Sequence, residues 1–268
     1  SSSSFAYSNN KLSSGKQHSC AILNNGSLKC WGYGSNGELG SGSNSGINAP
    51  SSTPINLGTG RTAIAVAAGV YNTCAILDNG SVKCWGNGYY GQLGAGNNTN
   101  TNAPFSTPID LGTGRTAVAL AVGGYHACAI LDNGSLKCWG SDEEGKLGNG
   151  AESGTITEPS STPIDLGIGR TAVAVATGEK HTCAIVDDGS LMCWGERQRH
   201  GTGSNLRIDS PGQVDIGTGR TALAVACNDA HTGQYGHTCA ILDGGDIKCW
   251  GYRGSGRLGY WPPSNWVL

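Results

Sequence analysis

The stretch Cys74-Ala-Ile-Leu-Asp-Asn-Gly-Ser-Val-Lys-Cys-Trp-Gly86 decides the fold, because the chain carries it five times with small changes. The other copies are Cys20–Gly32, Cys128–Gly140, Cys183–Gly195 and Cys239–Gly251. The first cysteines of successive copies are 54, 54, 55 and 56 residues apart, a period typical of solenoids and propellers. The chain is therefore one supersecondary unit repeated along its length.

Each copy predicts a β-hairpin with a defined register. Two apolar runs flank Asp78-Asn79-Gly80, a turn signal with glycine where a positive φ is needed. A two-residue Asn-Gly loop would put the two cysteines on opposite faces. A three-residue loop, a type I turn closed by Gly80 as a bulge, instead pairs Cys74 with Cys84 and Ile76 with Val82. Directly opposed residues have Cα separations of about 4.5–5.5 Å, within disulfide range.

We therefore expect one cross-strand disulfide in each copy. The pairs are Cys20–Cys30, Cys74–Cys84, Cys128–Cys138, Cys183–Cys193 and Cys239–Cys249. Closing an 11-residue loop contributes roughly 2.5–3 kcal/mol in the chain-entropy model. Such cysteine usage is typical of an oxidising compartment, so we expect a secreted or extracellular protein, with the cell surface included.

Composition restricts the class of protein further. Among 268 residues there are 45 Gly, 2 Phe and 1 Met, which indicates a turn-rich all-β chain. The net charge of −2 gives no electrostatic footprint for nucleic acid, and no apolar run approaches the ~20 residues that span a bilayer. We expect no nucleic-acid partner and no direct membrane insertion.

The third copy shows the expected strands of one full repeat: Pro108–Leu111, Ala117–Val122, Ala127–Leu131 and Ser135–Trp139. Both faces of the hairpins carry apolar residues, as in a propeller blade covered by two neighbours. Lys29 breaks this pattern, and its fourth-copy equivalent is Met192. We expect its stem to pack and its amine to reach solvent.

These strands predict a single domain over 1–268, a five-bladed β-propeller with repeats at about 1–49, 50–103, 104–158, 159–209 and 210–268. The first repeat begins with Ser1–Ser14, which covers only the second strand, and Pro263–Leu268 stands where a further first strand would be. Pairing of this last segment with the first blade would close the ring and leave no free edge. The alternative is a segment cut from a longer propeller or array.

A longer pattern recurs at His18–Gly40, Asn72–Gly94, His126–Gly148, His181–Gly203 and His237–Gly259. It reads His-Ser/Thr-x-Ala-Ile-Leu-x-x-Gly-x-x-x-x-Trp-Gly-x-x-x-x-Gly-x-Leu-Gly. This pattern resembles the repeat of the RCC1-like (regulator of chromosome condensation) β-propeller family. The resemblance covers essentially the whole chain. Family members commonly have seven blades, whereas this chain offers five, and the paired cysteines are foreign to the nuclear members. Chromatin binding and nucleotide exchange on a small GTPase are therefore not carried over.

Several motifs have a structural interpretation that we prefer to a catalytic one. His18, His126, His181 and His237 precede each first cysteine by two residues, and Asn72 replaces histidine in the second copy, which suits a hydrogen-bonding role. The cysteines lack C-x-x-C spacing, so we expect no zinc site, and no nucleophile–base constellation stands out. We expect no catalytic residue, no metal and no cofactor.

Function is expected where the copies differ. The loops after each Trp-Gly should emerge on one side of the ring, and exposed tyrosines and arginines are favoured interface anchors. The partner-binding candidates are Tyr33, Tyr89, Tyr90, Asp142, Glu143, Glu144, Arg197, Arg199, His200, Tyr252 and Arg253. The fourth copy has Thr202 where the family has leucine, so we expect an irregular edge there.

Two further positions are singled out. Cys227 is the eleventh cysteine, and we expect it either to be a free thiol or to form an intermolecular disulfide. Asn97 begins the sequon Asn97-Asn98-Thr99 in a long polar loop and is a glycosylation candidate. The leading hypothesis is a secreted, non-enzymatic module that binds a protein partner or joins an extracellular assembly. The alternative is a lectin-like propeller with several similar glycan sites.

Overall fold

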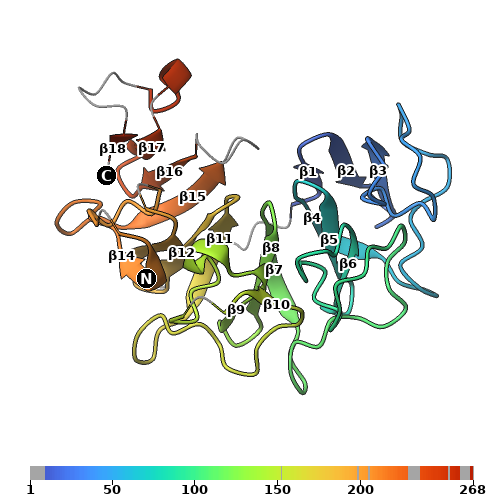
Figure 1. Cartoon of the computed structure of the whole chain (residues 1–268), viewed down its shortest axis with the longest axis horizontal. Helices are drawn as coiled ribbons and strands as arrows, with labels where there is room; N and C mark the ends of the chain where they lie inside the picture. Colours follow the sequence, from blue (N-terminus) through green and yellow to red (C-terminus); the bar gives the residue numbers. More distant parts are fainter. Residues whose placement is uncertain are drawn as a thin grey trace.

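The computed structural model describes residues 10–151, 153–197, 199–204, 206–228, 236–252, 254–259 and 266–267. Five antiparallel sheets follow one another around an arc (Figure 1). We number them blade one to blade five along the chain. The innermost strands of neighbouring blades, such as β4 and β7 or β11 and β15, contact one another.

The strands of each blade are as follows. Blade one has β1 (Leu12–Ser14), β2 (His18–Ile22) and β3 (Leu28–Gly32); blade two has β4 (Ala63–Ala68), β5 (Asn72–Leu77) and β6 (Val82–Gly86). Blade three has β7 (Ala117–Val122), β8 (His126–Leu131), β9 (Leu136–Ser141) and β10 (Thr155–Ile156); blade four has β11 (Ala172–Thr177), β12 (His181–Val186), β13 (Leu191–Gly195) and β14 (Ile208–Gln213). Blade five has β15 (Ala222–Asn228), β16 (His237–Leu242), β17 (Ile247–Tyr252) and β18 (Trp266–Val267), and two short 3-10 helices, η1 (Glu143–Gly145) and η2 (Gly254–Gly256), follow β9 and β17.

The hairpin register predicted from the turn is confirmed. Cys74 lies opposite Cys84 and Ile76 opposite Val82. Gly80 has a φ of +76° and its N–H donates to the Leu77 carbonyl, so glycine supplies the left-handed turn residue. All five expected disulfides are present, with Cα separations of 4.0 to 4.1 Å, slightly closer than expected.

The outer strand of each blade differs from the prediction. The segment Pro108–Leu111 is not a strand of blade three; the Ile109 N–H donates to the Val82 carbonyl, on the outer side of blade two. The pairing that extends the hairpins comes from the polar loops instead, through β10, β14 and the isolated bridges of Gly32 with Ile47 and of Gly86 with Thr101. Each sequence repeat is thus shared between two blades.

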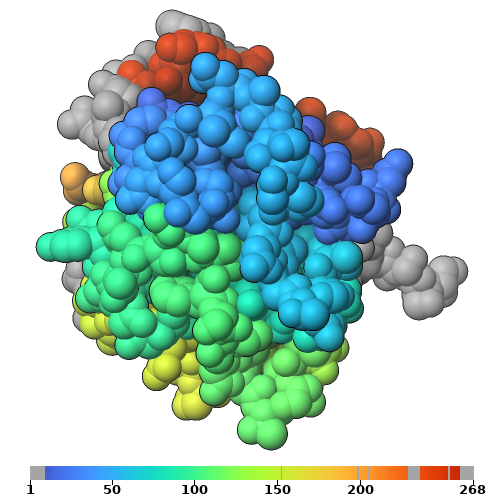
Figure 2. All heavy atoms as spheres, turned by 90° about the vertical axis from the view of Figure 1, so that its right-hand side faces the viewer, coloured from blue at the N-terminus to red at the C-terminus, as the bar shows by residue number. Residues whose placement is uncertain are grey.

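The long loops between blades also contact one another. The Gly42 N–H donates to the Asn102 carbonyl, and Gly96 N–H donates to the Thr157 carbonyl. Figure 2 views the molecule from the side of blades one and two and shows the two loop segments, in blue and green, side by side on the outer surface. These polar segments therefore seal the outside of the arc.

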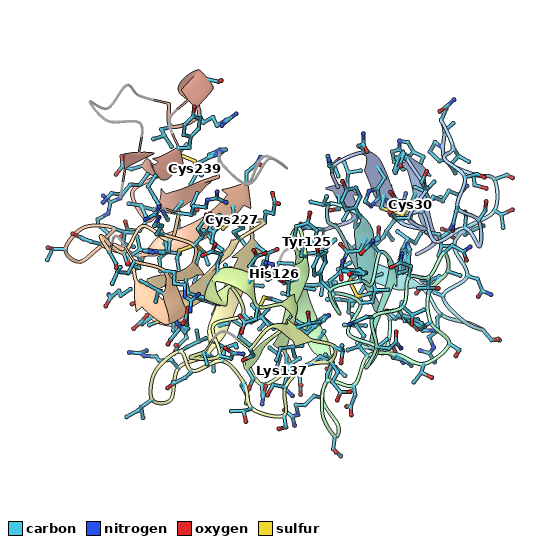
Figure 3. All side chains as sticks on the ribbon, in the orientation of Figure 1. Cys30, Tyr125, His126, Lys137, Cys227 and Cys239 are labelled. Carbon is cyan, nitrogen blue, oxygen red and sulfur yellow. A yellow bond between two sulfur atoms is a disulfide. The ribbon has the colours of Figure 1, made fainter. Side chains whose placement is uncertain are left out.

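The middle blades are covered on both faces, as predicted. All residues of β5, β8 and β12 are buried. Lys29, whose stem was expected to pack, is partly buried, and its amine donates to the Ser52 carbonyl at 3.4 Å in an exposed position. The equivalent Lys83 and Lys137 are more deeply buried, and their amines donate to the carbonyls of Ser106 and Leu111, so backbone acceptors satisfy them. Figure 3 shows Lys137 on the outer side of the arc.

The described residues do not show the predicted closure of the ring. Trp266 and Val267 pair with Tyr252 and Gly251 of β17, so this part of Pro263–Leu268 completes blade five and does not join blade one. Blade five exposes the apolar side chains of Leu223, Ile241 and Ile247, and Figure 1 shows blades one and five at the two ends of an open arc. No helix among the described residues has the length and apolarity needed to cross a membrane.

Candidate functional site

One end of the blades gathers the turn before each β-hairpin and the loop after each Trp-Gly, and we call it the loop face. The two segments of a blade are tied by one backbone hydrogen bond. In each blade the backbone N–H of the loop residue donates to the carbonyl of the turn residue at 2.8–2.9 Å. The pairs are Tyr33 to Gln17, Asn87 to Tyr71, Ser141 to Tyr125, Glu196 to Lys180 and Tyr252 to Gly236. All five divergent loops therefore emerge on one side, as predicted.

Tyrosines of blades two and three form a cluster on the loop face. The rings of Tyr89 and Tyr90 lie 5.0 Å apart, and those of Tyr90 and Tyr125 lie 4.9 Å apart, both edge to face. Tyr89 is 67% exposed and Tyr90 is 39% exposed. Burial raises the pKa of Tyr125, and the nearby carboxylate of Glu179 raises it further. The cluster thus offers rigid aromatic surface that is open to solvent.

Charged groups lie on either side of the tyrosines. The Lys16 amine donates to the Tyr71 hydroxyl at 3.2 Å and lies over its ring. On the other side, the Lys180 amine lies 4.0 Å from Glu144 of blade three and 3.8 Å from Glu196 of blade four. The loop face is therefore a mixed surface in which neighbouring blades are joined by polar contacts.

Three partner-binding candidates are not available on this surface. Asp142 and His200 are fully buried and Arg199 is 2% exposed. The Asp142 carboxylate accepts hydrogen bonds from the backbone N–H groups of Leu147 and Ser153, and Arg199 Nε lies 2.6 Å from Glu196. These side chains hold their own loops in shape.

The remaining candidates divide by exposure. Tyr33, Tyr89, Tyr90, Glu143 and Arg197 are exposed, and Glu144 and Tyr252 are partly buried. Arg253 lies outside the described residues. Four further residues of the loop face were not predicted from the sequence and come from the turns before the hairpins: Lys16, Tyr71, Tyr125 and Lys180. Their variation between copies was the signal that could have found them.

Lys146 is an unusual group beneath the tyrosine cluster. Its side chain is fully buried, and its amine has no hydrogen-bond partner among the described residues but lies 5.8 Å from the centre of the Tyr125 ring. Burial lowers the pKa of this amine to about 8, although the carboxylate of Glu143 counteracts the shift. Lys146 supports Tyr125 from below, as a cation facing an aromatic ring.

A central cavity of about 280 Å³ lies where the inner strands end. Residues from all five blades line it, among them Lys16, Gly69, Gly124, Glu179 and Cys227. Figure 3 shows Tyr125, His126 and Cys227 on the inner side of the arc. The cavity is flanked by small residues, so the axis of the molecule is hollow at the loop face.

Two cavities lie at equivalent junctions on the outer side. The one between blades three and four has a volume of about 720 Å³, and the one between blades two and three about 300 Å³. Phe105 lines the smaller cavity at the position that Ser160 occupies in the larger one. The junctions are therefore not equivalent ligand sites.

The histidines are structural joints between blades. His18, His126 and His181 are buried, and each Nε2 lies 2.7–2.8 Å from the hydroxyl of Thr73, Thr182 or Thr238 in the following blade. Asn72 replaces histidine where the following blade has Ala127 in place of threonine. Histidine and its partner are thus absent together, which explains the departure in the second copy.

We expect His18 to make the stability depend on pH. Burial lowers its pKa to about 4 from a usual value of 6.5, so between these values the unfolded chain binds a proton that the folded chain excludes. The free energy of unfolding therefore falls by about 3 kcal/mol from this group as the pH drops from 6.5 to 4. The measurement is urea unfolding across this range.

The matched variant is His18→Asn, which copies Asn72. It should be less stable than the native protein at pH 7, because the bond to Thr73 is altered, but its stability should fall less steeply below pH 6.5. If the free energy of unfolding changed with pH equally steeply in the two proteins, His18 would not be the source of the pH dependence. The difference between the two pH dependences separates the contribution of His18 from that of the other buried histidines.

The recurring arginines sit at the opposite end of the blades. Arg61, Arg115, Arg170 and Arg220 pair with the hairpin aspartates Asp78, Asp132, Asp187 and Asp243 at 2.6–3.4 Å. Asp110 accepts a hydrogen bond from the Gly112 N–H. Both contacts shape turns, away from the loop face.

Asn97 lies in an exposed loop, and its glycosylation stays a prediction.

The pattern of the Regulator of chromosome condensation (RCC1) repeat matches residues 25–76, 79–130 and 133–185. A second pattern of the same repeat matches 10–38, 63–92, 117–146 and 172–202. The chain belongs to the RCC1 repeat family. The resemblance seen in the sequence is confirmed, and this RCC1 protein has one disulfide within each of its five blades.

One named relative and two solved structures are similar to this chain. It is 31% identical over 252 residues to the ultraviolet-B receptor UVR8 of Arabidopsis thaliana, covering 93% of this chain and 54% of UVR8. Kap60-bound yeast RCC1 (Prp20) superposes with a TM-score of 0.75 at 20% identity, over 95% of this chain and 58% of that one. The ectodomain of the Arabidopsis thaliana receptor kinase ACR4 superposes with a TM-score of 0.51 at 21% identity, over 90% of this chain and 62% of the ACR4 chain. The two structures show the fold alone, and the RCC1 chain here spans about half the length of UVR8.

Proposed function

We propose that this RCC1 protein is a secreted, non-enzymatic module that binds a protein partner through its loop face. The observation that carries the proposal is the exposed tyrosine cluster of Tyr89, Tyr90 and Tyr125 beside the ion pairs of Lys180. Tyrosine supplies large contact area at a low cost in side-chain entropy, and binding hot spots are enriched in it. The disulfide-bonded blades hold this surface in place.

The cysteines support the proposed extracellular compartment. Five disulfides, four of them with both cysteines buried, are typical of an oxidising environment and rare in the cytosol, which supports an extracellular location. The ACR4 structure, described as an ectodomain, is an example of a similar fold in that setting. The yeast protein Prp20 was solved with Kap60 and studied for binding to Gsp1p and histones, which illustrates a fold of this type in protein recognition. The partner here is expected to be a different, extracellular protein.

The glycan alternative needs several similar sites. The cavities at the outer junctions differ more than twofold in volume, and the residue at one equivalent lining position is Phe105 in the smaller and Ser160 in the larger. Repeated glycan sites would need the same polar groups at each junction. The difference between the junctions supports a single protein-binding surface over a set of repeated glycan sites.

The test is a double substitution, Tyr89→Ala with Tyr90→Ala. The partner is first identified with a panel of secreted and cell-surface proteins, and its Kd is then measured against the variants. We expect at least a tenfold loss of affinity, because central aromatic anchors contribute about 2 kcal/mol or more. Ile168→Ala, which changes a fully exposed side chain at the opposite end, should leave the Kd unchanged.

Two results would contradict the proposal. One is an affinity that the tyrosine variant leaves intact while Ile168→Ala weakens it. The other is saturable binding to a defined sugar on a glycan array at more than one site per chain, which would favour the lectin-like alternative.

A further inference from the structure

A free thiol lies beside a disulfide at the junction of blades four and five. The side-chain ligand atoms of His181, Cys183 and Cys227 all lie within 4.8 Å of one another. Cys183 is bonded to Cys193, whereas Cys227 is a free thiol. The Cys183 sulfur is therefore not a thiolate ligand for a metal, and the cluster consists of a thiol beside a disulfide.

The backbone register directs Cys227 toward this disulfide. Cys227 lies opposite Thr238 on β16, and its side chain packs against the buried cluster that contains both Cys183 and Cys193. The strands β12 and β15 are in contact. Cys227 thus belongs to the packed junction between the two blades, and its thiol donates to the Ala176 carbonyl of blade four at 3.6 Å.

This arrangement occurs at one junction among the described residues. The positions equivalent to Cys227 on the other inner strands carry Ser14, Ala68, Val122 and Thr177. None of these can react with the disulfide of the preceding blade. Blade four therefore differs from the others in having a sulfur nucleophile next to its disulfide.

We infer that Cys227 and the Cys183–Cys193 disulfide form a thiol–disulfide exchange site. The Cys227 sulfur attacks the Cys183 sulfur, the Cys227–Cys183 bond forms, and the Cys183–Cys193 bond breaks. The proton lost by Cys227 ends on the released Cys193 sulfur. The step converts one thiol and one disulfide into another such pair, so no oxidant or reductant is consumed.

The site is reachable from outside. Cys227 is half-buried and lines the central cavity beside Asn228, Glu179 and Thr177. Cys183 and Cys193 are fully buried, so Cys227 is the sulfur of the three that solvent reaches. Exchange transfers the covalent link from within blade four to a bond between β12 and β15, and so fixes blade five to blade four at the cavity wall.

The test replaces the leaving sulfur. In Cys193→Ala, prepared under the oxidising conditions that form the other four disulfides, we expect peptide mapping without reductant to find Cys183–Cys227 in most molecules. The matched control is Cys138→Ala in blade three, because Thr177 of the following blade stands at the position equivalent to Cys227 and Cys128 should therefore remain an alkylatable thiol. Adding Thr177→Cys to that control should create the equivalent link between blades.

The native protein provides a second measurement if Cys193→Ala does not fold. It is incubated with a limiting amount of reduced glutathione, quenched in acid, alkylated and mapped. We expect a Cys183–Cys227 peptide together with alkylated Cys193, and loss of both signals in Cys227→Ser. Quantitative alkylation of Cys227 with only Cys183–Cys193 linked, or a Cys193→Ala protein that leaves Cys183 and Cys227 both as thiols, would overturn the inference.

Discussion

Trp139→Ala is expected to lower the free energy of unfolding by about 3–5 kcal/mol. Trp139 is fully buried, and its Nε1–H donates to the Gln92 carbonyl of blade two at 3.1 Å. Its indole ring also fits against Gly94, where an added Cβ would lie 2.7 Å from Nε1. The substitution removes the packing and leaves a buried carbonyl without its donor. We expect the Tm to fall by roughly 10 °C, measured by calorimetry.

Two variants separate the causes. Trp139→Phe keeps most of the apolar volume but removes the N–H donor, so its cost should be about 1–3 kcal/mol, the penalty for an unpaired buried carbonyl. Trp31→Ala changes the equivalent residue of blade one, which is only partly buried, and should cost less than Trp139→Ala. If Trp31→Ala lowered the free energy of unfolding as much as Trp139→Ala, the contact between blades would not be the source of the stability that Trp139 contributes.

The same joint recurs at four junctions. Trp85, Trp139, Trp194 and Trp250 donate to the carbonyls of Glu38, Gln92, Lys146 and Arg199, each in the preceding blade. The acceptor is a backbone atom, so the side chain at that position can vary from acid to amide to base. This explains why the tryptophan is constant while the residue that accepts its hydrogen bond differs in every copy.

Local features of the fold could be predicted from the sequence. The turn around Gly80 and the spacing of Cys74 and Cys84 fix the register of the hairpin, because both depend on residues within one repeat. The outer strand could not be assigned in this way. Thr155 and Ile156 form β10 inside a polar loop, and Ile109 pairs with the preceding blade; both choices depend on contacts between repeats.

The candidate site shows the same division between local and non-local information. The sequence located the loop face correctly but not the direction of its side chains, so buried Asp142 and Arg199 were counted with exposed Tyr89. In the fourth copy Gly201 follows Trp194 by seven residues, whereas Gly148 follows Trp139 by nine. His200, and not Thr202, therefore takes the place of the family leucine, and it is buried there.

Reduction of all five disulfides is expected to unfold most molecules at 25 °C. Each closes an 11-residue loop worth roughly 2.5–3 kcal/mol, and together they contribute on the order of 10 kcal/mol. This equals the whole stability of a typical domain. Urea unfolding with and without a phosphine reductant, followed by tryptophan fluorescence, measures the difference. A reduced protein with an unchanged unfolding midpoint would show that the cysteines act only as apolar core residues.

The double substitution of Cys74 and Cys84 by alanine is the control for one disulfide, and it should cost about 3 kcal/mol while leaving the protein folded. Both sulfurs in this pair are at most 1% exposed, so reduction of the native protein requires the blade to open first. We therefore expect reduction to be slow in buffer and to accelerate in urea concentrations below the unfolding midpoint. Rapid reduction of all five disulfides in buffer alone would contradict burial as their protection.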